Sequence, residues 1–133
     1  DIVITADLEW LKLWSLRFTN PLEDAETFAY ERNTLVSIGE TPKSLSEINA
    51  QFMGLIKLSQ KGWGELYSAF LQLSSEERKK LDMTSLLNFL LSIGITVHIE
   101  FINGKWCECD TYEDVLKYEQ AMLIEKNWSH DWR

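Results

Sequence analysis

Alternating and near-continuous runs of apolar residues divide the chain into predicted strands and helices. Period-two or unbroken apolar runs predict strands over residues 1–5, 26–31, 34–38, 51–58, 96–101 and 105–110. Apolar residues at helical spacing predict helices over residues 8–18, 63–73, 84–93 and 111–126, with a short capped helix after Ser74. Because strands and helices interleave without a linker or repeat, we predict an α/β fold with a mixed sheet and flanking helices.

Local signals add detail to several of these elements. Residues 51–58 are apolar on both faces, which predicts a strand at the centre of the sheet. Asp7 is the predicted N-cap of the first helix. The Asn103-Gly104 pair predicts a two-residue turn joining 96–101 and 105–110 in a hairpin. The last helix is expected to bury four apolar side chains: Val115, Leu116, Met122 and Leu123.

Composition narrows the class of protein. The 133 residues are 45% hydrophobic and 26% charged, as expected for one globular domain. A net charge of -8 without a basic stripe argues against nucleic acid as a partner. No apolar run approaches the roughly 20 residues that cross a membrane, and we expect a cytoplasmic protein. The chain opens on a strand pattern without Met, so we also expect it to be a fragment of a longer protein.

The predicted hairpin would sort its side chains onto two faces. The core-facing side would carry Glu108 and Asp110 beside apolar residues. Two desolvated carboxylates at this spacing repel one another, so their burial requires a cation or a raised pKa. A divalent ion such as Mg²⁺ meets this need with oxygen ligands. Alternatively, both carboxylates are solvated at the sheet edge, with Asp110 near the N-terminus of the last helix.

The opposite face suggests a weaker metal site. His98 would lie opposite Cys109 with Cys107 beside it, a set that could ligate zinc but lacks a fourth ligand and a standard spacing. Otherwise the two cysteines are free thiols in a reducing compartment. The six tryptophans pack in the core or at an interface, or hold a cationic ligand such as a quaternary ammonium group. No Gly-rich phosphate loop or nucleophile motif occurs.

Residues 104–114, Gly-Lys-Trp-Cys-Glu-Cys-Asp-Thr-Tyr-Glu-Asp, resemble a W-x-E-x-D-T-x-E-D signature. That signature lies near the end of nucleotidyltransferases that make nucleoside-diphosphate-activated alcohols and sugars, and the phosphocholine and phosphonate cytidylyltransferases are the most similar type. The resemblance extends back through residues 51–55, 38–44, 20–27 and 7–14, and so covers nearly the whole chain.

The resemblance implies the second half of a Rossmann-like nucleotidyltransferase fold. Residues 1–133 would form a single domain, the C-terminal part that binds substrate and metal. The N-terminal half, with its Gly-rich nucleotide loop and one metal-binding Asp, would be absent. Asp110 and Glu108 would be the catalytic residues and the Mg²⁺ ligands.

The resemblance also implies a substrate pocket. Trp10, Phe52 and Gly54 would bind the alcohol or ammonium part of the acceptor. Relatives usually carry lysines before the proline at position 42, whereas this chain has Glu40-Thr41, so Lys43 is the remaining candidate for contact with phosphate.

The implied function is Mg²⁺-dependent nucleotidyl transfer from CTP or another nucleoside triphosphate to a phospho- or phosphono-alcohol such as phosphocholine. The chain alone is expected to be inactive, because the loop that cradles the nucleotide phosphates is absent. The alternative is a non-catalytic assembly or dimerisation module, in which exposed aromatics including Trp128 and Trp132 pack against another chain. In either case we expect a homo-oligomer.

Overall fold

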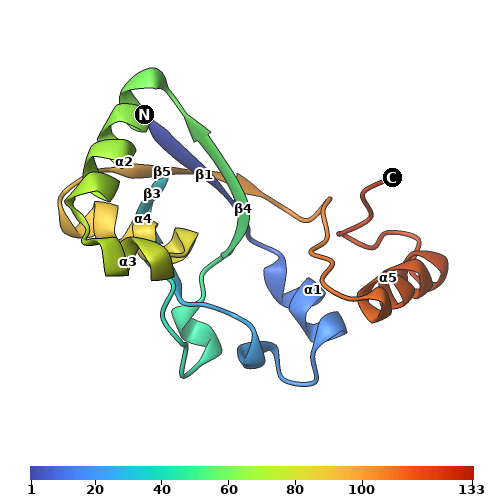
Figure 1. Cartoon of the computed structure of the whole chain (residues 1–133). Helices are drawn as coiled ribbons and strands as arrows, with labels where there is room; N and C mark the ends of the chain where they lie inside the picture. Colours follow the sequence, from blue (N-terminus) through green and yellow to red (C-terminus); the bar gives the residue numbers. More distant parts are fainter.

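The computed structural model describes all 133 residues as a five-stranded sheet with helices beside it and at one end (Figure 1). The predicted α/β class with a mixed sheet and flanking helices is confirmed. In chain order the elements are β1 (Ile2–Asp7), α1 (Trp10–Arg17), β2 (Phe28–Glu31), β3 (Thr34–Ile38), β4 (Gln51–Leu58), α2 (Gln60–Gln72), α3 (Ser75–Lys80), α4 (Met83–Ser92), β5 (Val97–Ile102) and α5 (Tyr112–Ile124). Short 3-10 turns cover Pro21–Glu23 and Leu45–Glu47.

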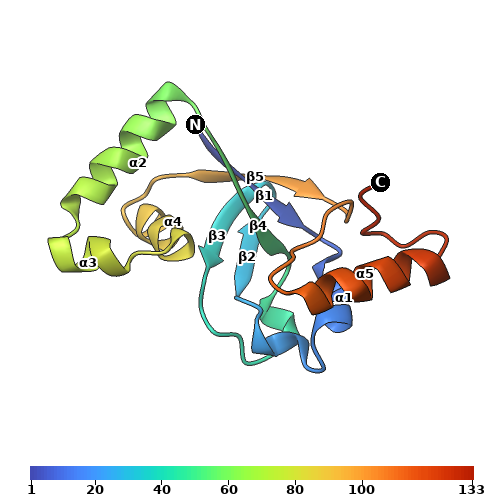
Figure 2. The same ribbon diagram turned by 45° about the vertical axis from the view of Figure 1, so that its right-hand side comes forward.

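The strands run in the order β2-β3-β5-β1-β4. β1 and β5 are parallel at the centre of the sheet, while β4 pairs antiparallel with β1, and β3 pairs antiparallel with both β2 and β5. Helices α2, α3 and α4 gather at one side, whereas α1 and α5 lie beyond the end of β1 (Figure 2). One end of the sheet therefore contains the carboxyl ends of β1 and β5 together with the start of β4. In α/β sheets, crevices form at the carboxyl ends of the strands.

Strand β4 lies at the edge of the sheet, so the prediction that it is central is wrong. Its burial falls from Gln51, which is buried, to Leu55, which is 61% exposed. An apolar run with residues on both faces did not distinguish a central strand from an edge strand. A bulge interrupts the pairing with β1, and Gly54 adopts a positive φ of 79° there.

The predicted hairpin over residues 96–110 does not form. Its first half is β5, with Val97 and Ile99 buried and His98 exposed, as the alternation indicated. Residues 105–110 have no strand partner, because β5 already pairs with β1 and β3. The zinc alternative, which needed His98 opposite Cys109, therefore loses the pairing on which it was based.

The residues at the Asn103-Gly104 turn contact distant parts of the chain and do not close a hairpin. The Gly104 N–H donates to the Asp7 carboxylate at 2.9 Å, and the Lys105 N–H donates to the Ser129 carbonyl at 2.8 Å. A Cβ at Gly104 would lie 2.1 Å from the Ser129 carbonyl oxygen, so this close approach requires glycine.

The molecule contains two hydrophobic clusters. The larger packs the sheet against α2 and α4, and the smaller joins α1 and α5 around Trp10, Trp14, Tyr118 and Trp128. Helix α5 begins at the predicted Thr111–Asp114 capping box. It buries Tyr118 and Ala121, while Leu116 and Leu123 are exposed and Val115 and Met122 are half-buried. The predicted buried face of this helix is therefore wrong for its two leucines.

Asp7 is the last residue of β1 and is fully buried, although the sequence predicted a helix cap. Its carboxylate accepts hydrogen bonds from the Glu9 and Gly104 amides and the Trp106 indole, and pairs with His130 at 2.8 Å. Burial alone would raise the pKa of Asp7, but these hydrogen bonds outweigh it and lower the pKa. Asp7 thus holds the 103–106 turn and the C-terminal segment against the end of β1.

Candidate functional site

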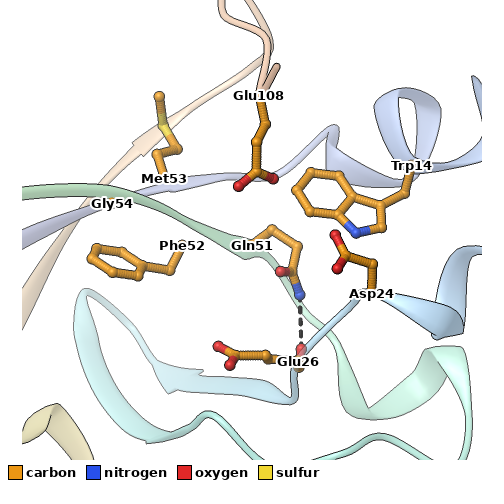
Figure 3. A pocket seen from close by; sticks show the side chains of 8 residues that line it. All are labelled: Trp14, Asp24, Glu26, Gln51, Phe52, Met53, Gly54 and Glu108. Carbon is orange, nitrogen blue, oxygen red and sulfur yellow. Dashed lines mark hydrogen bonds between the residues drawn. The ribbon is translucent and has the colours of Figure 1, made fainter. Parts of the chain in front are cut away.

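A cavity of about 290 Å³ opens at the edge where β4 begins (Figure 3). Its lining combines carboxylates, rings and an amide: Trp14, Asp24, Glu26, Gln51, Phe52, Met53, Gly54 and Glu108. The Gln51 amide donates to the backbone carbonyl of Glu26 at 2.7 Å, so one wall is fixed (Figure 3). Three carboxylates beside two aromatic rings form a surface that suits a cationic ligand.

Helix α1 places Arg17 in contact with two carboxylates of this cavity, Asp24 and Glu108. The buried residues of α1 are Trp10, Leu13, Trp14 and Arg17, which have the i, i+3, i+4, i+7 spacing of one helix face. The Arg17 side chain is only 2% exposed, and its guanidinium lies 4.9 Å from the Phe18 ring centroid and 5.4 Å from that of Trp14. The last turn of the helix therefore carries a buried cation into the acidic region.

Four carboxylates surround the Arg17 guanidinium. It contacts Glu108 at 2.9 Å, Asp114 at 3.4 Å and Asp24 at 3.9 Å, and it also donates to Asp110. The sequence predicted that Glu108 and Asp110 lie on the core-facing side of a hairpin, which is wrong: their side chains are 41% and 60% exposed, and Arg17 contacts both. Burial nevertheless raises the pKa of Glu108, against the lowering effect of Arg17.

Asp114 is the most buried of these carboxylates and is held by the cap of α5. Burial alone would raise its pKa, but hydrogen bonds from Thr111 and Asp110 together with the charge of Arg17 lower it. The same cap fixes the backbone amide of Asp110, which donates to Asp114 at 3.2 Å. The position of Asp110 is thus set by the N-terminus of α5.

Three of these carboxylates could hold a divalent cation. Asp24, Glu108 and Asp110 can each offer one oxygen, and these oxygens lie within 4.8 Å of one another. Hard oxygen ligands suit Mg²⁺. One guanidinium faces four carboxylates, so the cluster retains excess negative charge, and all three candidate ligands also contact Arg17.

Trp14 brings an unpartnered donor to the cavity wall. The side chain is 2% exposed, and its indole N–H is buried without a hydrogen-bond partner. The indole nitrogen is turned toward the side of the cavity where Asp24 lies (Figure 3). Buried donors are normally paired, so this N–H is an unsatisfied donor beside the cavity.

The structure brings together some of the sequence-predicted site residues. Phe52, Gly54 and Glu108 line the cavity, and Asp110 reaches the same cluster through Arg17. Trp10 is buried and packs edge-on against Trp14, 6.1 Å between ring centroids, so it supports the wall without lining it.

Lys43 is exposed before the Leu45–Glu47 turn and does not line the cavity. Sequence reasoning missed Arg17, Asp24, Glu26 and Trp14 as site residues. The helical spacing of Arg17 with Trp10 and Trp14 was the signal that could have placed it on the buried face of α1.

The chain is similar to the CTP:phosphoglutamine cytidylyltransferase of Campylobacter jejuni. The two are 34% identical over 121 residues, which cover 86% of this chain and 48% of that protein. The chain thus spans about half the length of this curated relative. The predicted relationship to cytidylyltransferases is confirmed, although the relative acts on phosphoglutamine and the phosphocholine type is not supported by its name. No family model and no solved structure matches the chain.

None of the helices is both long enough and apolar enough to cross a membrane.

Replacing Arg17 with methionine is expected to lower the free energy of unfolding by about 2–3 kcal/mol at pH 7, because buried Asp114 loses its cation while the more exposed partners lose less. The pKa of Asp114 is lowered, so its contribution is present above the usual 3.8 and is lost as the pH falls below that value. The difference from the parent should therefore shrink at pH 3. Urea unfolding at both pH values measures this, and an equal loss at pH 3 would contradict it.

Proposed function

We propose that this chain forms the acceptor side of a cytidylyltransferase, which transfers a cytidylyl group from CTP to a phosphorylated acceptor that carries an amine. The observation that carries the proposal is an acidic, ring-lined cavity in a chain related to a CTP:phosphoglutamine cytidylyltransferase. A cavity of this kind favours a positively charged group, because its carboxylates attract the charge and its rings can contact it by cation–π attraction.

The unpartnered Trp14 N–H narrows the choice of acceptor substrate. An amino-acid phosphate carries an ammonium group for the carboxylates and also a carbonyl or carboxylate oxygen that could accept from the Trp14 N–H. Phosphocholine has a quaternary ammonium group but no oxygen near it that would serve this donor equally well. We therefore propose a phosphorylated amino acid or amino-acid amide as the acceptor, in preference to phosphocholine.

In the proposed reaction an oxygen of the acceptor phosphate bonds to the α-phosphorus of CTP, and the α–β phosphoanhydride bond breaks to release pyrophosphate. Glu26 would hold the ammonium group, and Asp110 and Asp24 would face the phosphates. Arg17 would keep these carboxylates in place when no other cation is near. Mg²⁺ held by Asp110, Glu108 and Asp24 would offset phosphate charge and permit the carboxylates to approach the two phosphates.

We propose that the loop binding the CTP phosphates lies outside these 133 residues. Two observations support this proposal: no Gly-rich phosphate motif occurs in the chain, and the relative is about twice as long. We expect the 133-residue chain to release no pyrophosphate from CTP above background.

Calorimetric titration of the 133-residue chain tests the acceptor. We expect phosphoglutamine to bind, phosphocholine to bind at least 10-fold more weakly, and Trp14→Phe to remove most of the difference, because it retains a ring and deletes the donor. Trp63→Phe, at an exposed position of α2, is the matched control and should change neither affinity. Equal binding of both compounds would refute the preference, and binding of neither would refute the acceptor site.

A second candidate function, assembly, is favoured by one exposed stripe on α2. Trp63, Tyr67 and Leu71 lie at i, i+4 and i+8 and are 47–55% exposed, with the two rings stacked. Trp128, which the sequence placed among the exposed aromatics, is 6% exposed and packs on Tyr118, so that part of the prediction is wrong.

If the α2 stripe mediates assembly, sedimentation should show a dimer that Tyr67→Glu dissociates. A monomer at high concentration would exclude this role.

A further inference from the structure

A second cavity, of about 440 Å³, lies on the other side of the segment that carries Glu108. It is lined by rings, thiols, one aliphatic side chain and one cation: Lys105, Trp106, Cys107, Cys109, Val115, Tyr118 and Trp132. Alternate residues of this segment face the two cavities, since Glu108 lines the acceptor cavity whereas Cys107 and Cys109 line the second. Residues 107–109 therefore contribute side chains to both cavities.

The charge of the second cavity is opposite to that of the acceptor site. It contains no carboxylate, whereas the acceptor cavity contains three. Its single charged side chain is Lys105, which forms no ion pair in the structure. The nearby Asp131 carboxylate is paired with Arg133 at 2.8 Å. Lys105 is therefore a cation without an ion-pair partner, to which an anionic group could bind.

The remaining lining suits a flat apolar group. Tyr118 and Trp132 meet edge-to-face, with ring centroids 6.3 Å apart, and Trp106 and Val115 complete the walls. The Tyr118 hydroxyl is already used, because it donates to the backbone carbonyl of Glu108. The volume lies in the range of small-molecule sites. An aromatic ring system fits these walls, and an acidic substituent on it would reach Lys105.

We propose that this cavity is a second binding site, specific for a small planar aromatic anion. The inference is independent of the proposed acceptor and of the metal. The site recognises its ligand through ring contacts with Trp106 and Trp132 and through the Lys105 ammonium group, and Cys109 lies at its rim with an exposed thiol.

The test uses 8-anilinonaphthalene-1-sulfonate as the anionic aromatic probe and N-phenyl-1-naphthylamine as its uncharged counterpart. We expect the sulfonate to bind the 133-residue chain at one site. Val115→Trp, which fills the cavity, should weaken its binding at least 10-fold. Lys105→Gln should weaken the sulfonate about 3- to 10-fold and leave the uncharged probe unchanged. The matched controls Val36→Trp and Lys61→Gln, at exposed positions of β3 and α2, should change nothing.

The rate of Cys109 modification by a thiol reagent gives a second measurement. Bound sulfonate probe should slow this reaction in the parent chain and in Val36→Trp, but not in Val115→Trp. Circular dichroism and thermal midpoints verify that each variant is folded. Unchanged affinity in Val115→Trp, or Cys109 reacting equally fast with and without probe, would place the probe elsewhere, for example on Trp63 and Tyr67, and would overturn the proposal.

Discussion

Asp7→Asn is expected to lower the free energy of unfolding by about 3–5 kcal/mol, because buried donors lose hydrogen bonds to a charged acceptor that are worth roughly 1.5–3 kcal/mol each. The carboxylate is fully buried and accepts from two amides, one indole and the His130 ring. An asparagine has one accepting oxygen, and its amide group would face donors. Denaturant unfolding at pH 7 measures the change, and a loss below about 1 kcal/mol would contradict this role.

The pH dependence of the same variant provides a sharper test. The pKa of Asp7 is lowered in the folded protein, so the stability it contributes is present above the usual 3.8 and is lost as the pH falls through the lower folded value. The parent and Asp7→Asn should therefore converge in strong acid. Asp82→Asn is the matched control: Asp82 is an exposed N-cap of α4, and asparagine caps a helix about as well.

Asp110→Asn is expected to lower cytidylyl transfer about 100-fold or more, equivalent to about 2.7 kcal/mol of barrier, and to weaken its Mg²⁺ dependence. The substitution keeps the shape of the side chain and deletes the charge that would face phosphate and metal. Asp110 is 60% exposed, so the loss of its contact with Arg17 should cost less than about 1 kcal/mol of stability. Steady-state turnover against Mg²⁺ concentration, in the protein as its gene encodes it, measures the effect.

Cysteine variants supply the control for Asp110→Asn. Cys107 is half-buried, and burial raises its pKa to about 12, so its thiol is not a ready nucleophile at neutral pH. Cys109 does not line the acceptor cavity. Cys107→Ser and Cys109→Ser should leave turnover nearly unchanged. Parent-like turnover in Asp110→Asn, together with loss of activity in a cysteine variant, would contradict the assignment of Asp110.

The sequence predicted most elements of the fold because their signals are local. The capping boxes at Ser74 and Thr111 both form, and Gly94 follows the end of α4 with a positive φ. The hairpin after β5 failed because its outcome depends on distant residues. Asp7 and Ser129 bond the amides at Gly104 and Lys105, and no local pattern shows that they will.

The candidate site was only partly predicted, because some of its contacts also depend on residues far apart in the sequence. Glu108 and Asp110 stood out because two carboxylates flanked by apolar residues are unusual. Their predicted position on the core-facing side of a hairpin is wrong, since their side chains are 41% and 60% exposed, but both contact a cation. That cation, Arg17, lies more than 90 residues earlier and meets the carboxylates only because α1 and α5 pack together. The order of the strands could not be predicted from local patterns either, because β1 pairs with β5, a strand that lies far from it in the sequence.

The most direct test of the central claim is acceptor-dependent release of pyrophosphate from CTP by the protein as its gene encodes it. We predict that phosphoglutamine supports pyrophosphate release in the presence of Mg²⁺, with a CDP-linked product formed in equal amount. Omitting the acceptor should abolish the reaction. Absence of turnover with every phosphorylated amine offered, or pyrophosphate release that does not depend on the acceptor, would contradict the claim that this cavity binds the acceptor of a cytidylyltransferase.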